Sequence, residues 1–301
     1  MHIAVTGATG FVGRHVAAAL VHRGHRVRTL ARRPERARHV LGPAPEVVPG
    51  DLGDATTLAR LVQGCDVVIH LVGIIVEAGA ATFAAVHVEG TRHMLAAARA
   101  AGVSRFVHMS ALGARDEPGA TAYHRTKRQA EELVREAKLS SAVFRPSLIS
   151  GPENVPVRAI ARLHRWSPVV PVFGDGRFAM QPVWIEDVAL AFAKAAEQPG
   201  LVGVYQLGGP AVLTYEEFVL AIGRAAGVPR PVIHVPLAAA RAAARVFDLL
   251  GRAAPLTSDQ LQMLVEGSAT PANAIESVFA IRPLPFEAGL RRYLSPSPEP
   301  V

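Results

Sequence analysis

Cysteine is almost absent from this sequence, and lysine is rare. Cys65 is the single cysteine among 301 residues, so the chain can form neither an internal disulfide nor a cysteine-based metal cluster. This composition is typical of a reducing compartment, where Cys65 serves as a small buried hydrophobic residue. Only three of the 32 basic residues are lysines, Lys127, Lys138 and Lys194. Each lysine is therefore informative, because an ammonium and a guanidinium differ in chemistry.

Long apolar runs and several catalytic motifs are also missing. No run reaches the roughly 20 residues of a membrane-spanning helix, and an apolar segment begins soon after Met1, so we expect no signal segment, no transmembrane helix and a cytoplasmic location. The 12 histidines form no H-E-x-x-H zinc motif, so we expect no metal site and histidines that are solvated or hydrogen-bonded. The sequence also lacks the G-x-S-x-G elbow of serine hydrolases and the P-loop of phosphoryl-transfer enzymes.

Positive charge is concentrated near the N-terminus. The formal net charge is +7, and residues 1–50 contain eight arginines against Glu35 and Glu46. Such a basic segment attracts either nucleic acid or a polyanionic cofactor. The sequence shows no helix-turn-helix, zinc finger or aromatic-rich nucleic-acid platform. We therefore favour the cofactor and expect no nucleic-acid partner.

Three glycines mark a candidate cofactor site. Gly7, Gly10 and Gly13 have G-x-x-G-x-x-G spacing, follow the apolar run Ile3–Val5 and open a helical stretch at residues 11–22. Glycines at a strand-to-helix turn let the backbone approach a pyrophosphate, and the helix N-terminus then offers it N–H groups and a positive dipole end. The pattern predicts a bound dinucleotide.

Short β-rich runs alternate with helical stretches in the first half of the chain, which is typical of a doubly wound α/β fold with a parallel sheet. The expected strands are Ile3–Thr6, Val27–Ala31, Glu46–Pro49, Asp66–Val72, Arg105–Met109 and Ala142–Arg145. The expected helices lie near residues 11–22, 54–63, 81–101 and 121–138. Gly24 and Gly102 suit the left-handed end of a helix.

The chain changes character after Pro146, where prolines become frequent. We expect a dinucleotide-binding domain over residues 1–150 and a smaller substrate lobe over residues 151–294. Strand and helix returns to the first domain are expected near residues 178–210, where residues 202–207 resemble a further strand of the main sheet. Residues 295–301 are rich in proline and serine and are expected to be disordered.

Several polar residues of the second half are explained by helix capping. The candidates are Asp187 as the N-cap before residues 188–197, and the capping boxes of Thr214 with Glu217 and of Thr257 with Gln260. The alanine-rich stretch Leu237–Leu250 is either a membrane-surface or partner-docking helix, or a helix packed on the lobe with solvated arginines. We favour the packed helix.

Arginines occupy the position that distinguishes NADP from NAD. Fingerprints for NAD usually place an acid about 20 residues after the glycines, at the ribose 2′-hydroxyl. Arg32 and Arg33 occupy that place, and a guanidinium pairs with a 2′-phosphate. NADP(H) is therefore the predicted cofactor and NAD(H) the second choice, unless these arginines are only solvated charges. Asp51 follows the third strand, where it either accepts a hydrogen bond from the adenine amino group or caps the next helix.

Tyr123 and Lys127 are the candidate catalytic pair. They are four residues apart in a helical stretch, so their side chains emerge on one face. A phenol with a pKa of about 10 is a poor catalyst at neutral pH, but a neighbouring ammonium stabilises the phenolate and lowers that pKa. Tyr123 can then exchange a proton with a substrate oxygen while hydride moves to or from a nicotinamide.

Several motifs along the chain resemble those of the short-chain dehydrogenase/reductase superfamily, in its extended, epimerase-like branch. The motifs are GATGFVG at 7–13, GDLGD at 50–54, HVEGT at 87–91, RFVHMSALGA at 105–114, YHRTK at 123–127, FRPSLISGP at 144–152 and PVWIEDVA at 182–189. RFVHMSALGA and PLTSDQLQML at 255–264 are similar to the atypical group related to the NDUFA-nine accessory subunit of respiratory complex I. The resemblance implies a Rossmann sheet and a nicotinamide dinucleotide.

The resemblance also implies site residues, with two departures. Further cofactor contacts are implied at Thr9, Phe11, Val12, Leu52, Leu71, Val72, Gly73, Tyr123, Lys127 and Pro146. The family's catalytic serine falls where Leu112 stands, and its asparagine falls where His87 stands. Ser110 either partly replaces the missing serine or only satisfies backbone groups at the strand end. Without a second hydroxyl, hydride transfer loses a few kcal/mol of transition-state stabilisation.

Two function classes follow from these residues. The first is an NADP(H)-dependent oxidoreductase or epimerase-like enzyme acting on a small molecule, and the resemblance implies a nucleotide sugar or another phosphorylated or acidic compound. Arg158, Arg162, Arg165 and Arg177 are candidates for meeting such a substrate or are ordinary surface charges. The second class is a catalytically silent NADP(H)-binding redox sensor or accessory subunit of a respiratory complex. A homodimer or a peripheral place in a complex fits either class.

Overall fold

The computed structural model describes residues 1–249 and 256–295. The chain packs into two compact units, which are described separately. The first unit comprises Met1–Pro146 and Val188–Gln206, and the second comprises Ser147–Asp187 and the chain from Leu207 onward. Of the tail expected to be disordered, residues 296–301 lie outside the described residues.

A seven-stranded sheet forms the centre of the first unit, in the order β11-β6-β5-β4-β1-β2-β3. Its strands are β1 (His2–Thr6), β2 (Arg26–Ala31), β3 (Glu46–Pro49), β4 (Val67–His70), β5 (Arg105–Met109), β6 (Ser140–Pro146) and β11 (Gly203–Leu207). Neighbouring strands from β1 to β6 pair in parallel. Strands such as β1 and β4 are nearly continuous apolar runs because helices cover both faces. The predicted doubly wound sheet is confirmed, with β11 as its expected further strand.

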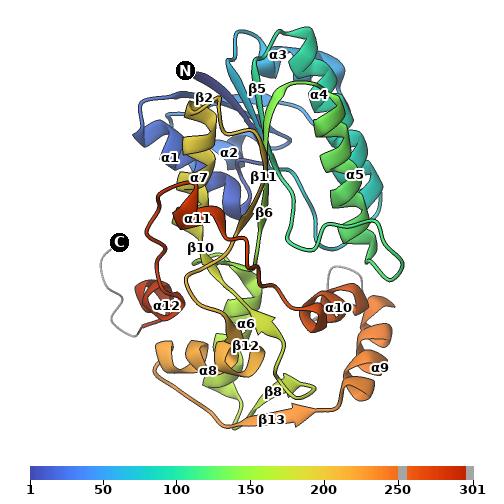
Figure 1. Cartoon of the computed structure of the whole chain (residues 1–301), viewed down its shortest axis with the longest axis vertical. Helices are drawn as coiled ribbons and strands as arrows, with labels where there is room; N and C mark the ends of the chain where they lie inside the picture. The colour runs from blue at the N-terminus through green and yellow to red at the C-terminus, as the bar shows by residue number, and fades with distance from the viewer. Residues whose placement is uncertain (250–255, 296–301) are drawn as a thin grey trace. The chain divides into compact units, whose positions relative to one another are not determined.

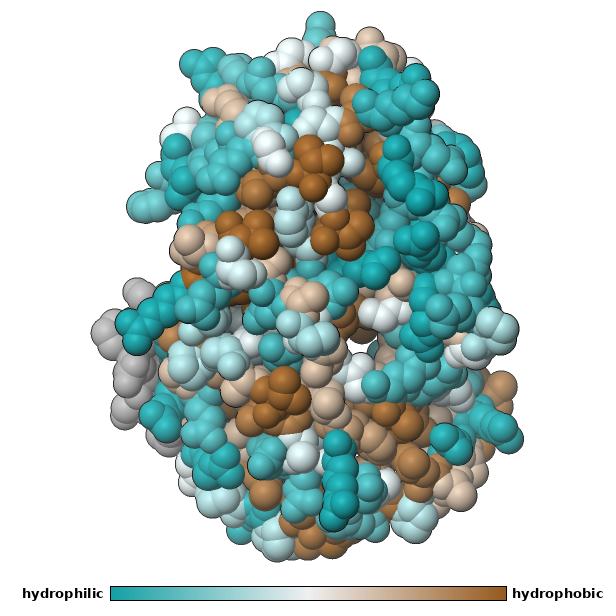
Figure 2. Space-filling model, in the orientation of Figure 1, coloured by the Kyte–Doolittle hydropathy of each residue, from teal (hydrophilic) through white to brown (hydrophobic). Residues whose placement is uncertain are grey.

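Two sets of helices cover this sheet (Figure 1). One side carries α1 (Phe11–His22), α2 (Pro34–Leu41) and α7 (Ile185–Glu197), and the other carries α3 (Ala55–Val62), α4 (Gly90–Ala100) and α5 (Ala122–Glu136). The side of α5 that faces the viewer in Figure 2 is hydrophilic. Helix α1 has the predicted bounds, and Gly24 and Gly102 have the predicted positive φ.

Two parts of the first unit differ from the prediction. Helix α2 was not expected, although it begins with Pro34 and ends before Gly42, which are ordinary start and stop signals. The helix expected over residues 81–101 opens with a π-helical turn, η1 (Ala84–Glu89), before α4. Such turns interrupt helices mostly at functional positions, and this one contains His87.

Short strand pairs and helices build the second unit. The pairs are β7 (Ile149–Ser150) with β10 (Val183–Trp184), β9 (Ala179–Met180) with β12 (Leu213–Thr214), and β8 (Val170–Phe173) with β13 (Val232–Val235). The helices are α6 (Val155–Trp166), α8 (Tyr215–Ala225), α9 (Leu237–Phe247), α10 (Ser258–Glu266), α11 (Ala274–Ser277) and α12 (Phe286–Leu294). The core lies between α6, α8 and α12, where Phe218 stacks on Phe286 with ring centroids 4.9 Å apart.

Both predicted capping boxes are present, whereas the Asp187 prediction is wrong. The capping boxes at Thr214 and Thr257 start α8 and α10. Helix α7 begins at Ile185, directly after β10, so Asp187 lies in its first turn rather than at the N-cap. Its carboxylate instead accepts the Leu284 N–H at 2.9 Å, and burial raises the pKa of Asp187 to about 6.

Helix α9 is the packed helix favoured for residues 237–250. Ala240 and Ala244 are buried against Leu261 of α10, while Arg241 and Arg245 are exposed. Leu250, the last residue of the predicted stretch, lies outside the described residues.

Candidate active site

The turn between β1 and α1 requires glycine. Gly7 has a φ of +76°, and a Cβ atom on it would lie 3.0 Å from the Val72 nitrogen and 3.1 Å from the Leu71 carbonyl carbon. A Cβ atom on Gly13 would lie 2.1 Å from the Gly7 carbonyl oxygen. Gly10 is the N-cap of α1 and supplies no side-chain cap. The turn therefore presents the first N–H groups and the positive end of α1, which suit a pyrophosphate.

The residues predicted to bind the cofactor follow the carboxyl ends of consecutive parallel strands. These ends meet at one edge of the sheet. They are the turn Gly7 to Gly13 with Thr9, Phe11 and Val12 after β1, Arg32 and Arg33 after β2, Asp51 and Leu52 after β3, Leu71, Val72 and Gly73 after β4, Ser110 after β5, and Pro146 at the end of β6. The Leu52 side chain packs on the hydrophobic core beside α4, and Val12 and Leu71 are buried as well.

Asp51 does not cap the next helix. The N-cap of α3 is Asp54, whose carboxylate accepts the N–H groups of Thr56 and Thr57. Among residues 1–249 and 256–295, the Asp51 carboxylate accepts only the N–H of Gly53, at 2.8 Å, and the residue is exposed. The capping alternative is therefore wrong, and the prediction that Asp51 meets adenine stays open.

Arg32 and Arg33 are exposed at the start of α2. Arg32 follows β2 directly, and Arg33 is the residue that precedes the first turn of α2. Neither forms an ion pair with a carboxylate within residues 1–249 and 256–295, whereas Arg38 of the same helix pairs with Glu35 at 2.6 Å. The two guanidinium groups are thus available to an anion from solution.

Helix α5 places Tyr123 and Lys127 against the sheet. Its N-cap, Thr121, accepts the His124 N–H at 3.2 Å and so fixes where the helix begins. Lys127 is buried, and its Nζ donates to the Met109 carbonyl at the end of β5, at 3.0 Å. The predicted pair is thus anchored to the strand that ends at the same sheet edge as the glycine turn.

Burial sets the protonation of this pair. The Tyr123 ring is enclosed by Phe83, His87 and His124, with centroids 5.5 to 5.9 Å away. Burial raises the pKa of Tyr123 to about 12 and lowers the pKa of Lys127 to about 8. The expectation that the ammonium lowers the phenol pKa is wrong in this environment, because loss of water around the phenol dominates.

His87 ties the loop after β4 to α5. His87 Nδ1 lies 2.9 Å from the Thr126 hydroxyl oxygen, which is also 2.9 and 3.0 Å from the carbonyl oxygens of Ala122 and Tyr123. His87 Nε2 lies 3.1 Å from both the N–H and the carbonyl oxygen of Ile74, so the tautomer decides whether it accepts from the first or donates to the second. Burial and the Lys127 charge lower the pKa of His87 to about 3, so its ring is neutral at neutral pH.

Gly73 permits the close approach of the loop to α5. A Cβ atom on Gly73 would lie 3.0 Å from Lys127 Nζ and 3.5 Å from His87 Nε2. The loop backbone, the histidine and the lysine therefore converge on one point. His87, which stands where the resemblance places an asparagine, joins the structure at that point through both ring nitrogens.

Ser110 is a buried hydroxyl without a partner. Its Oγ makes no hydrogen bond within the described ranges 1–249 and 256–295. The alternative that Ser110 satisfies backbone groups at the strand end is therefore wrong. Leu112, two residues further on, uses its N–H to bind the Pro146 carbonyl at 3.0 Å.

Two further histidines near this edge were not identified from the sequence. His70 and His108 are paired across β4 and β5, fully buried and stacked with centroids 5.5 Å apart. Thr6 bonds His70 Nδ1 at 2.7 Å, but His70 Nε2 and both His108 nitrogens have no partner among the described residues. The expectation of solvated or hydrogen-bonded histidines is wrong for His108. The sequence signal that could have identified His108 was its position within a strand of apolar residues.

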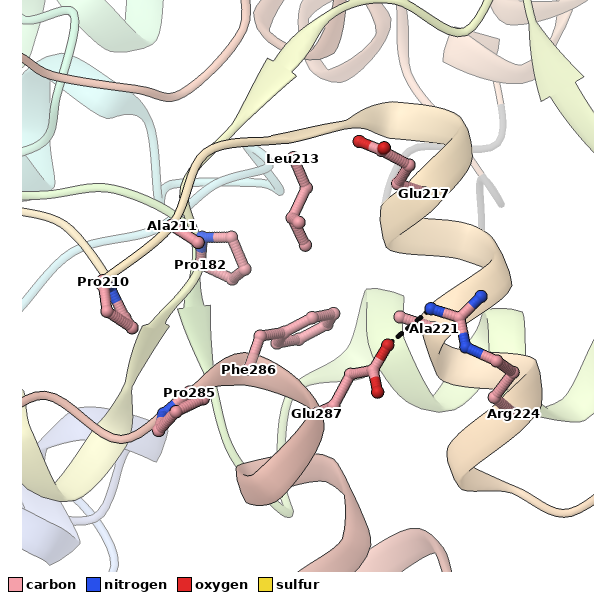
Figure 3. Close-up of a pocket in the computed structure, with 10 residues that line it drawn as sticks. All are labelled: Pro182, Pro210, Ala211, Leu213, Glu217, Ala221, Arg224, Pro285, Phe286 and Glu287. Atoms are coloured by element: carbon pink, nitrogen blue, oxygen red, sulfur yellow. Dashed lines mark hydrogen bonds and ion pairs between the residues drawn. The ribbon is translucent and has the colours of Figure 1, made fainter.

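A separate pocket lies within the second unit (Figure 3). Its volume is about 360 Å³, and Leu213 and Phe286 point into it. The charged groups on its rim are already engaged, because Glu217 closes the capping box of α8 and Arg224 pairs with Glu287. None of the predicted site residues lines this pocket.

Two features are absent from the described residues. In residues 1–249 and 256–295, no three histidine, cysteine or acidic side chains are grouped so that they could hold a metal ion. No helix in the same ranges combines the length and the apolar character needed to cross a membrane.

Three curated relatives resemble this chain. Ceramide reductase of Caulobacter vibrioides is 39% identical over 68% of this chain, a match that spans 63% of the relative's length. A 4-hydroxy-2-methyl-3-oxo-4-farnesyl-3,4-dihydroquinoline-1-oxide ketoreductase of Stigmatella aurantiaca is 32% identical over 84% of this chain and 81% of its own. Subunit 9 of the NADH dehydrogenase [ubiquinone] 1 alpha subcomplex of Arabidopsis thaliana is 30% identical over 92% and 71%.

A solved structure and a family model also resemble this chain. The UDP-glucuronic acid 4-epimerase of Bacillus cereus, in complex with UDP-glucuronic acid and NAD, superposes with a TM-score of 0.76 over 98% of this chain and 99% of its own, at 18% identity. This likeness shows the shared fold. The model of the NAD dependent epimerase/dehydratase family matches residues 3–208, which include the glycine turn and the Tyr123–Lys127 pair. The chain therefore belongs to the NAD dependent epimerase/dehydratase family.

Proposed function

We propose that this protein is a cytoplasmic reductase that transfers hydride from NADPH to a ketone, with NADH as its second-choice cofactor. One observation carries the proposal. Lys127 is buried on α5 and fixed to the end of β5, at the sheet edge that also carries the glycine turn, and Tyr123 lies one helical turn before it with its ring beside Phe83, His87 and His124. Proton donation and dinucleotide binding then belong to one site.

The protonation of Tyr123 favours reduction. A phenol with a pKa of about 12 keeps its proton at neutral pH, so Tyr123 acts as the acid that protonates the substrate oxygen. The bound dinucleotide supplies the hydride that forms the new C–H bond. Lys127, whose pKa is lowered to about 8, then returns a proton to the phenolate and regains one from solvent.

Other residues of the site support this chemistry. The Ser110 hydroxyl, which has no partner among the described residues, can donate to the substrate oxygen in place of the serine missing at Leu112. Gly7, Gly10 and Gly13 let the backbone of the turn close tightly, so that the first N–H groups of α1 can bind a pyrophosphate. Asp51, exposed after β3, is assigned to the adenine.

The preference for NADPH rests on Arg32 and Arg33. Both are exposed after β2 and are assigned to the 2′-phosphate, which their guanidinium groups bind as charge-assisted pairs. Replacing both by aspartate should weaken NADPH by about tenfold or more and NADH far less. Calorimetry measures both affinities, and Arg36→Asp on the exposed side of α2 is the control. Equal losses for NADPH and NADH would contradict the assignment.

The names of two relatives suggest the substrate class. One reduces ceramide, and the other is a ketoreductase whose substrate carries a farnesyl chain. We therefore assign a ketone that carries a long hydrocarbon chain. A nucleotide sugar has weaker support, because the superposed UDP-glucuronic acid complex shares only 18% identity with this chain.

Tyr123→Phe tests the catalytic proposal. NADPH consumption is followed with long-chain ketones and with nucleotide sugars, for the wild type and for the variant. Turnover should fall by about a hundredfold or more while NADPH affinity is kept, because only the proton donor is removed. Tyr205→Phe removes the same hydroxyl from a tyrosine of β11, whose OH donates to the Val202 carbonyl, and it should turn over normally. Equal turnover by wild type and Tyr123→Phe would refute the mechanism.

A second candidate function is an accessory subunit of a respiratory complex. The match to the Arabidopsis thaliana NADH dehydrogenase subunit covers 92% of this chain, and Leu112 and His87 replace two residues of the family's catalytic pattern. NADPH binding with no turnover on any ketone or nucleotide sugar would favour this candidate over the reductase.

A further inference from the structure

Helix α6 of the second unit has an apolar face that is exposed to solvent. Val157, Ala161 and His164 form its buried stripe, at the i, i+4 and i+7 spacing of one helix face. The opposite face carries Val155, 74% exposed, and Trp166, 85% exposed. A tryptophan so fully in water is unusual, because the ring is a large apolar group.

The apolar residues of this face lie together. At 100° per residue, Val155, Ala159 and Trp166 fall within one strip directly opposite the buried stripe, and Leu163 borders it. Leu163 is 40% exposed, and Ala159 is exposed as well. The strip runs the length of the helix, from its first residue to its last.

Three arginines border the other side of the same strip. Arg158, Arg162 and Arg165 are exposed and recur at i, i+4 and i+7, and α6 contains no acidic residue. Arg162 and Arg165 form no ion pair with any residue in the described parts of the chain. Arginines on other helices are engaged, since Arg92 pairs with Glu89 on α4 and Arg128 with Glu132 on α5.

We propose that α6 docks on the surface of an anionic lipid bilayer. An apolar strip with a tryptophan at one end suits the boundary between headgroups and acyl chains, and a row of unpaired arginines beside it suits anionic headgroups. A nucleic acid would engage the arginines but leave Val155 and Leu163 in water. The binding is peripheral, because the 12 residues of α6 lie along the surface and do not cross it.

Vesicle binding tests this surface without any cofactor or substrate, so its outcome is independent of the reductase proposal. The probes are vesicles of phosphatidylcholine alone and of phosphatidylcholine with phosphatidylglycerol, used in co-sedimentation. We expect binding to the anionic vesicles, weakened by salt, and little binding to the neutral ones. Trp166 reports insertion by a blue shift of its fluorescence, since Trp184, the other tryptophan, is already buried.

Matched variants distinguish binding through α6 from a general effect of net charge. Arg162→Glu with Arg165→Glu should weaken binding by about tenfold or more, whereas Arg241→Glu with Arg245→Glu on α9 makes the same charge change at exposed positions and should leave it nearly intact. Val155→Ser on α6 and Val246→Ser on α9 form the equivalent apolar pair, with side chains 74% and 63% exposed. All these positions are exposed, so the fold should persist, which circular dichroism checks.

Three outcomes would overturn the proposal. The first is no binding to anionic vesicles. The second is an equal loss in the α6 and α9 pairs, which would show a nonspecific effect of net charge. The third is a self-association in solution that Trp166→Ser abolishes, because the face would then bind a second copy of this chain.

Discussion

The glycine turn and the Tyr123–Lys127 segment of α5 belong to the same unit but depend on different parts of the chain. The turn is fixed by its own backbone, because a side chain at Gly13 would overlap the Gly7 carbonyl. The α5 segment is fixed by residues far away in sequence, through the bonds of His87 to Thr126 and of Lys127 to Met109. A backbone-determined site can be identified from a short motif, whereas a side-chain-determined site depends on contacts that no motif records.

The largest effect is expected in the turn. In Gly13→Ala the new Cβ atom would lie 2.1 Å from the Gly7 oxygen and 2.6 Å from the Ala8 Cα atom, and backbone atoms cannot yield as a flexible side chain would. The free energy of unfolding should fall by about 3 kcal/mol or more. Urea denaturation measures this loss, and NADPH titration should show no binding.

Gly200→Ala is the matched control for this prediction. A Cβ atom on Gly200 meets nothing within 4 Å, and its φ lies outside the positive region. Its unfolding free energy should change by no more than about 0.5 kcal/mol. If the two variants were equally stable, the turn would not owe its sequence to steric overlap.

The sequence predicted the backbone-determined features well. The doubly wound parallel sheet, the bounds of α1 and the two capping boxes all follow from local patterns of apolar residues, glycines and caps. Helix α2 had the same kind of signal in Pro34 and Gly42 and was missed because it is short, with eight residues, and buries only Ala37.

The features that were missed depend on distant contacts. Asp187 has the composition of an N-cap, but its carboxylate binds the N–H of Leu284, 97 positions away. His108 lies in an ordinary buried strand, and only the pairing of β4 with β5 places it against His70. The raised pKa of Tyr123 depends on the rings that enclose it, among them Phe83 and His87.

Low pH should affect the two parts of the site differently. The segment GATGFVG at 7–13 contains no titratable side chain, whereas histidines lie beside the α5 segment. Burial lowers the pKa of His70 to about 3 and that of His108 well below 6.5, and His87 is lowered to about 3. An unfolded histidine takes up a proton near pH 6.5 and the folded one does not. Stability is therefore complete above pH 6.5 and falls toward pH 3, by up to about 1.4 kcal/mol per pH unit for each histidine.

His108→Phe tests this acid dependence. Phenylalanine keeps the ring that stacks on Phe106 and His70 and removes two buried nitrogens without partners in the described chain. The free energy of unfolding, measured from pH 7 to pH 4, should fall less steeply in the variant, because one of the three histidines with a lowered pKa is absent. At pH 7 the variant should be about as stable as the wild type or more so. Identical slopes would show that His108 titrates normally.

The smallest effect is expected at His87, where it should appear in catalysis rather than in stability. His87→Phe keeps a ring against Phe83 and Tyr123 but removes the bonds to Ile74 and Thr126 that join the β4 loop to α5. We expect kcat to fall by about tenfold with NADPH affinity little changed, because a small displacement of the proton donor costs rate more than binding.

Two further variants show whether His87 positions Tyr123 through its hydrogen bonds. His87→Asn supplies an amide that can both donate and accept, so it should recover part of the lost kcat. His22→Phe, at the exposed end of α1, makes the same chemical change away from α5 and should leave kcat unchanged. If His87→Asn were as slow as His87→Phe, ring packing rather than hydrogen bonding would be what the α5 side of the site requires. The α5 side of the site would then differ from the glycine turn only in that side-chain shape, rather than backbone shape, determines it.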